Sequence, residues 1–107
     1  MNLNGATFDS VDLTGANLRG VDLRGRHLRK ANLIDANLEG ANLHNADLKA
    51  AILSNANLSG ANLNKASLEF AILVDTNLNK ANLWNANLVE ANLSATKLVE
   101  ANLVNAS

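Results

Sequence analysis

Leucine returns at every fifth residue along the chain, and this spacing constrains the fold more than any other feature. Leucine fills twenty of the 21 positions from 3 to 103, and Phe8 fills the remaining one. Two residues earlier, sixteen of 22 positions are alanine, and the exceptions are Met1, Val11, Val21, Arg26, Thr76 and Thr96. Asparagine or aspartate usually stands between the two. The repeat is therefore A-(N/D)-L-x-x, whose five positions we number one to five from the alanine.

A period of five suits neither an α-helix nor a flat strand. A helix turns about 100° per residue, so the leucines would spread around it without forming an apolar stripe. In a flat strand, side chains alternate between faces, so successive leucines would point to opposite sides. A chain that bends once per repeat while coiling about an axis turns every leucine inward. The alanine two residues earlier also points inward, because two residues is the strand period.

The segment ANLIDANLEGANLHNADL, residues 31–48, closely resembles the pentapeptide-repeat proteins. The resemblance implies an all-β fold, a right-handed quadrilateral parallel β-helix (a solenoid) with four repeats per coil. Residues 1–107 would then form a single domain of about five coils, and at ~4.8 Å per coil the rod would be roughly 25 Å long. The twenty-residue spacing from Thr76 to Thr96, and from Ile52 to Ile72, independently favours four repeats per coil.

Two side-chain arrangements follow from this coil. Position-two asparagines stack in columns, such as Asn17, Asn37, Asn57 and Asn77, and we expect them to form hydrogen-bonded ladders along the stack. Arg26 occupies a slot otherwise kept for alanine, where a buried guanidinium without a partner is very unfavourable. We therefore expect a local bulge at Gly25-Arg26 that turns the arginine to solvent.

Composition narrows the classes of function. The 107 residues carry nine Lys or Arg and ten Asp or Glu, a net charge of −1, which argues against direct binding of nucleic acid. Cysteine is absent, so thiolate chemistry is excluded. No apolar run approaches the ~18 residues of a membrane helix, and no leader opens the chain. We expect a cytoplasmic, bacterial protein without membrane contact.

Few residues offer catalytic chemistry. With twenty residues per coil, His27, Asp47 and Ser67 share one outward column, but nucleophilic catalysis needs the histidine in the middle. His44 falls on another side, so a two-histidine metal site is not expected. We predict no catalytic residue, no cofactor and no metal. The cations between Arg19 and Lys30 are expected to be compensated by neighbouring acids.

Exposed apolar residues point to contacts with other proteins. Ile34, Ile52, Phe70, Ile72 and Val74 are predicted to share one wall and form a candidate partner surface. A second apolar set at the C-terminal end consists of Trp84, Val99, Leu103 and Val104. An open coil invites pairing, so either two rods stack end to end or the chain is a fragment of a longer protein, and we predict the end-to-end homodimer with this set as its candidate interface.

Two functions remain. The first is a non-catalytic structural or protein-interaction rod with an unknown protein partner. The alternative, implied by the resemblance, is a DNA-mimicking protein that binds a topoisomerase, DNA gyrase. The near-neutral charge favours the first function, because a DNA mimic needs an excess of acids.

Overall fold

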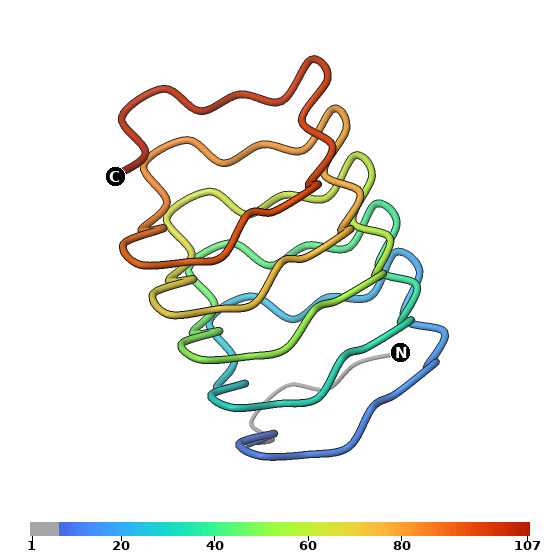
Figure 1. Ribbon diagram of the computed structural model, residues 1–107. Helices are drawn as coiled ribbons and strands as arrows, with labels where there is room; N and C mark the ends of the chain where they lie inside the picture. Colours follow the sequence, from blue (N-terminus) through green and yellow to red (C-terminus); the bar gives the residue numbers. More distant parts are fainter. Residues whose placement is uncertain (1–6) are drawn as a thin grey trace.

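The chain winds as a four-sided spiral whose coils stack along one axis (Figure 1). The computed structural model describes residues 7–107, which form isolated parallel bridges rather than continuous strands. Sixteen bridges are present, and each joins residues twenty apart. The predicted right-handed quadrilateral β-helix is therefore confirmed, with principal dimensions of 29 × 23 × 21 Å. The expectations for Met1, Leu3 and Ala6 lie outside the described residues.

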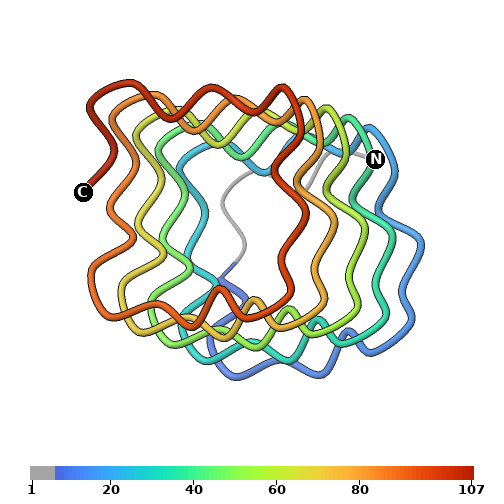
Figure 2. The same ribbon diagram turned by 45° about the horizontal axis from the view of Figure 1, so that its top comes forward.

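Each repeat builds one side of the square, and we number the four faces in chain order (Figure 2). Bridged residues are all at position two and run up the faces in four columns. These are Asp12-Asn32-Ile52-Ile72-Asn92 on face 1, Asn17-Asn37-Asn57-Asn77-Lys97 on face 2, Asp22-Asn42-Asn62-Asn82-Asn102 on face 3 and Thr7-His27-Asp47-Ser67-Asn87 on face 4. A face comprises the repeats that contain its column, so face 1 is residues 11–15, 31–35, 51–55, 71–75 and 91–95.

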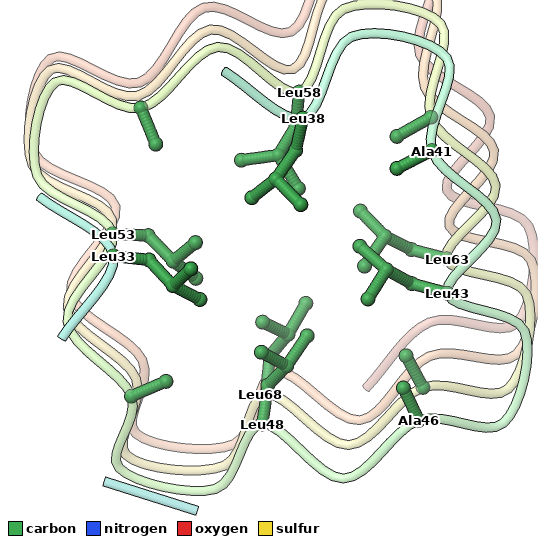
Figure 3. Packing of buried hydrophobic residues seen from close by; sticks show 14 of the residues in the cluster. Leu33, Leu38, Ala41, Leu43, Ala46, Leu48, Leu53, Leu58, Leu63 and Leu68 are labelled. Carbon is green, nitrogen blue, oxygen red and sulfur yellow. The ribbon is translucent and has the colours of Figure 1, made fainter. Parts of the chain in front are cut away.

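The leucines and alanines fill the bore of the spiral, as the period of five predicts. Leucines from Leu23 to Leu83 are at most 1% exposed, and the position-one alanines between them are equally buried. Figure 3 shows leucines from four sides converging on the axis, with Leu38 beneath Leu58 and Leu43 beneath Leu63. Because each coil covers the next, every internal leucine is removed from water by neighbours twenty residues away.

The backbone satisfies four of the five N–H groups in a typical repeat. In residues 33–37, the Leu33 N–H donates to the coil ahead, at the Ile52 carbonyl (2.7 Å), and the Asn37 N–H donates to the coil behind. The Asp35 N–H also reaches the coil ahead, and the Ala36 N–H closes a turn on the Leu33 carbonyl (3.1 Å). The position-four N–H, that of Ile34, is left over.

The position-two side chain accepts this fifth N–H. Asn32 Oδ1 accepts the Ile34 N–H at 3.1 Å, and the same contact recurs around the spiral, for example from Ser59 to Asn57 at 3.0 Å. Such Asx turns explain why asparagine and aspartate dominate the slot, since both carry an oxygen that can accept the N–H two residues later. Our prediction of Asn–Asn ladders was wrong: in the described range, these oxygens serve the backbone locally.

Every corner has a left-handed residue at position five. Glycine takes this place at Gly15, Gly20, Gly25, Gly40 and Gly60, but fifteen other corners use non-glycine residues with φ between 57° and 62°. A type II turn requires positive φ there, and the repeat imposes it whatever the residue.

The predicted bulge at Gly25-Arg26 does not occur. The Arg26 N–H donates to the Leu23 carbonyl (3.1 Å) and its own carbonyl accepts the Asp47 N–H (2.9 Å), as in a regular repeat. Arg26 is half-buried, and its Nε donates to the Arg24 carbonyl at 3.0 Å. The long side chain brings its charged head to a polar partner without distorting the backbone, so a bulge is unnecessary.

Candidate interaction surface

Face 1 carries all three isoleucines of the chain, Ile34, Ile52 and Ile72. The Ile52 and Ile72 backbones bridge directly, so their side chains occupy successive coils of the same column. Ile72 is 38% exposed, while Ile34, Ile52 and Val74 are half-buried. The five residues predicted to form a partner surface therefore do share this wall and its corner, where Phe70 is 45% exposed.

The two stacked isoleucines remove a hydrogen bond that most repeats make. Isoleucine has no side-chain oxygen, so the N–H groups of Ser54 and Val74 have no protein acceptor among residues 7–107. The replacements His27 on face 4 and Lys97 on face 2 are compensated from the neighbouring coil, whereas Ser67 on face 4 leaves the Glu69 N–H without a protein acceptor among residues 7–107. Asp9 accepts the Arg29 N–H at 2.9 Å above His27, and Asn79 does the same for the Val99 N–H above Lys97. Face 1 lacks this compensation.

Phe70, beside the same wall, has a backbone conformation that is unfavourable for a bulky residue. It occupies the left-handed corner position with φ of 62°, where a bulky side chain is disfavoured. Its ring lies 5.8 Å from Lys49 Nζ, a cation–π contact from the preceding coil. The ring is thus held at the corner between faces 4 and 1 rather than in the core.

The charges of face 1 are all negative. Its described repeats contain Asp12, Asp35 and Asp75 and no Lys or Arg, so the nine cations all lie on the other three faces. Asp35 and Asp75 are exposed and make no ion pair within the described chain. They occupy the same corner position, two coils apart.

Three acids on the other faces are paired with arginines. Arg19 meets Glu39 at 3.0 Å and Arg24 meets Asp22 at 2.8 Å, and Arg29 pairs with Asp47. Of Asp9, Asp12 and Asp22, the acids expected to offset the N-terminal cations, only Asp22 forms an ion pair among the described residues; the other two arginines pair with acids of the next coil.

The pairs with Arg24 and Arg29 lower the pKa values of the Asp22 and Asp47 carboxyls. Hydrogen bonds from the Arg24 side chain and N–H lower the pKa of Asp22 to about 2. For Asp47, partial burial acts to raise the pKa, but the hydrogen bonds from Arg29 and from the Lys49 N–H outweigh it and the pKa is lowered.

The C-terminal apolar residues are exposed as a group. Val99 is 66% exposed, Val104 58% and Leu103 41%. Trp84 is half-buried, and its ring lies 5.6 Å from Lys65 Nζ. Homodimerisation through this end stays a prediction.

The column of His27, Asp47 and Ser67 has the predicted order, with Asp47 bridged to both neighbours. Within residues 7–107, no three His, Asp or Glu side chains gather closely enough to hold a metal ion. No helix in that range has the length and hydropathy to cross a membrane. A cavity of about 270 Å³ at the N-terminal end of the bore is lined by apolar side chains and Asn17.

The four-sided coil, its twenty-residue register and its inward leucines define a parallel β-helix solenoid. A sequence profile described as pentapeptide repeats matches the chain in eight copies, over residues 1–25, 16–55, 41–79, 51–87 and 76–107. The chain belongs to the pentapeptide repeat family. No curated protein sequence matches it.

Solved structures of the same family resemble the chain. A pentapeptide repeat protein from the Arabidopsis thaliana thylakoid lumen shares 31% identity with a TM-score of 0.72, over 94% of this chain and 66% of that protein. This chain therefore spans just under two thirds of that relative. Rfr23, from the cyanobacterium Cyanothece 51142, shares 31% identity over 85% of this chain and 86% of its own, with a TM-score of 0.47.

A fluoroquinolone resistance protein has the same fold. QnrB1, described as plasmid-mediated, aligns with a TM-score of 0.55 at 14% identity, over 94% of this chain and 59% of its own. At this identity, the likeness shows the fold alone.

Sequence reasoning missed the unsatisfied N–H groups of face 1. The signal was present, because an Asx turn needs an oxygen at position two and Ile52 and Ile72 have none. The all-acidic charge of this face was also readable once twenty residues per coil were assumed.

Proposed function

We propose that the protein is a non-catalytic protein-interaction rod and that face 1 docks its partner protein. The observation that best supports this proposal is the stack of Ile52 on Ile72, which leaves the N–H groups of Ser54 and Val74 without their usual acceptors. An asparagine at either place would supply that acceptor. Isoleucine at both places therefore favours a role outside the fold's own stability, and burial against a partner is the role that its exposed apolar surface suits.

Rigidity supports the same function. Position-two and leucine N–H groups of the inner coils are bonded to the coils on either side, so the wall is held as a flat, fixed surface. A partner then binds without ordering a loop, which lowers the entropic cost of association. A cytoplasmic location and a bacterial source stay predictions.

Catalysis is not part of the proposal. The one outward column that combines histidine, aspartate and serine has Asp47 between His27 and Ser67, so the histidine cannot relay a proton from the serine under the usual arrangement. The column also lies on a wall and not in the cavity, which is lined by other residues.

The gyrase-binding DNA mimic is the weaker candidate. A mimic of duplex DNA needs acidic charge along the rod, whereas this chain has nine cations against ten acids and pairs several of them. A supercoiling assay with purified gyrase is expected to show no effect of the protein.

Capture from an extract of the source cell tests the proposal. The double variant Ile52→Asn/Ile72→Asn is expected to lose the partner that the wild type retains, while its circular dichroism stays unchanged. Val89→Asn, on face 4 and 46% exposed in the wild type, is the matched control and is expected to retain the partner. Equal capture by the wild type and the isoleucine variant would contradict the proposal.

A further inference from the structure

We propose that face 1 receives a two-turn amphipathic helix that carries Lys or Arg along one flank. This inference rests on the proposed function and names the chemistry of the partner. Its observations are the size of the apolar patch, the paired backbone beneath it, and the acids at its edge.

The exposed acids of face 1 favour a partner with positive charge. Asp35 and Asp75 lie at the same corner of face 1, exposed and without ion pairs in the described chain, while no cation belongs to this face. Lys49, on face 4, is engaged with the Phe70 ring at the corner between faces 4 and 1. Like charges facing each other oppose association. Nucleic acid, anionic lipid and a second copy of face 1 are therefore disfavoured, and a basic flank is favoured.

The backbone excludes docking by an added strand. On the repeats that carry Ile34, Ile52 and Val74, ladder hydrogen bonds run to the coils both ahead and behind. A peptide strand needs an open row of N–H and carbonyl groups, whereas this wall offers only the two separate N–H groups of Ser54 and Val74. Recognition on this wall must come from side chains, which suits the apolar stripe of a helix.

The patch has the dimensions of two helical turns. Ile34, Ile52 and Ile72 lie on three successive coils, and hence span ~10 Å along the rod axis at ~4.8 Å per coil. Two turns of α-helix are ~10.8 Å long, with a diameter of ~10–12 Å including side chains. Apolar residues at i, i+3 or i+4, and i+7 would therefore meet the three coils.

The same spacing positions the basic residues. Asp35 and Asp75 are separated by two coils, ~10 Å along the axis. Residues seven apart on a helix are separated by ~10.5 Å and lie on nearly the same side. A helix parallel to the rod axis, with Lys or Arg at two positions seven apart beside its apolar stripe, would pair with both acids.

A matched pair of synthetic peptides tests the inference. Both are helical peptides of about 16 residues with leucines at i, i+4 and i+7; one has arginines at two flanking positions seven apart, and the other has glutamates there. Binding is measured by fluorescence anisotropy in ~50 mM salt, where surface charges are weakly screened. We expect the arginine peptide to bind at least ~10-fold tighter than the glutamate peptide.

Three variants separate charge from apolar contact. Asp35→Asn/Asp75→Asn is expected to reduce the preference for arginine to within ~2-fold, because the attraction is removed. Glu90→Gln/Glu100→Gln changes two corner acids on faces 4 and 2, and is expected to leave the preference intact. Ile52→Asn/Ile72→Asn is expected to abolish binding of the arginine peptide.

The outcomes distinguish the two proposals. Equal binding of both peptides, an unchanged preference in the Asp35→Asn/Asp75→Asn variant, or no binding of either peptide would overturn the basic helix. If the isoleucine variant still lost the cellular partner in the capture experiment, face 1 would remain the interaction surface. Undiminished arginine-peptide binding and partner capture by that variant would overturn both.

Discussion

The side-chain oxygen at position two should stabilise the spiral by accepting the position-four N–H, and Asn57 on face 2 offers a clean test. Asn57 Oδ1 accepts the Ser59 N–H at 3.0 Å, in a half-buried setting away from face 1. Asn57→Ala removes the acceptor. Asn57→Asp keeps an oxygen in the same place.

The expected magnitude follows from the single lost contact. A net intramolecular hydrogen bond stabilises a protein by about 0.5–1.5 kcal/mol. Asn57→Ala should therefore lower the free energy of unfolding by about 1 kcal/mol, equivalent to a fall in Tm of about 4–8 °C for a domain of this size. Asn57→Asp should stay within about 0.5 kcal/mol of the wild type.

On face 1 the missing acceptor can be added instead of removed. Ile52→Asn should be more stable than Ile52→Ala by about the same 1 kcal/mol, because the asparagine gives the Ser54 N–H its missing acceptor. Comparing each variant with alanine removes the separate effect of losing the isoleucine side chain.

Thermal unfolding and amide hydrogen exchange together form the assay. Unfolding followed by circular dichroism gives the stability, and exchange by NMR reports on the Ser59 and Ser54 amides individually. The Ser59 amide should lose protection in Asn57→Ala, and the Ser54 amide should gain protection in Ile52→Asn. Equal stability of the alanine and aspartate variants at position 57, with an unprotected Ser59 amide in the wild type, would refute the reasoning.

Three further predictions concern single contacts. Thr76→Val should lower the free energy of unfolding by about 0.5–1.5 kcal/mol in urea denaturation, because the buried hydroxyl donates at 2.7 Å to a carbonyl of the preceding coil. NMR titration should give Asp22 a pKa of about 2, and Arg24→Gln should raise it; because the folded pKa is depressed, the stabilisation is present at neutral pH and lost as pH falls toward 2. Light scattering should show a concentration-dependent dimer, which Leu103→Asn/Val104→Asn abolishes; a monomer at high wild-type concentration would contradict the end-to-end pairing.

The core and the register were predictable because they depend on side-chain size and period alone. Twenty leucines at one spacing admit one inward direction; the resemblance to pentapeptide-repeat proteins implied four repeats per coil, and the separation of Ile52 from Ile72 agreed with it. The face assignments followed directly, because the twenty-residue register places Ile34, Ile52, Ile72 and Val74 on one face.

The two wrong predictions, the asparagine ladders and the bulge at Arg26, depended on which hydrogen bonds the backbone groups make. The asparagine oxygen is used by an N–H two residues away, which becomes apparent only when the other four N–H groups of a repeat are assigned. Arg26 was expected to distort the chain because its slot was treated as fully enclosed, whereas the arginine is half-buried and its Nε reaches the Arg24 carbonyl. Pattern alone supplies neither fact.

Isoleucine methyl NMR tests the central claim most directly, because Ile34, Ile52 and Ile72 are the only isoleucines and all lie on face 1. The protein carries labelled isoleucine and valine methyl groups and is mixed with the partner recovered by capture. We predict that all three isoleucine signals shift or broaden on binding, while those of Val99 and Val104 remain in place. Binding that leaves the isoleucine signals unchanged would contradict the assignment of face 1 as the docking surface.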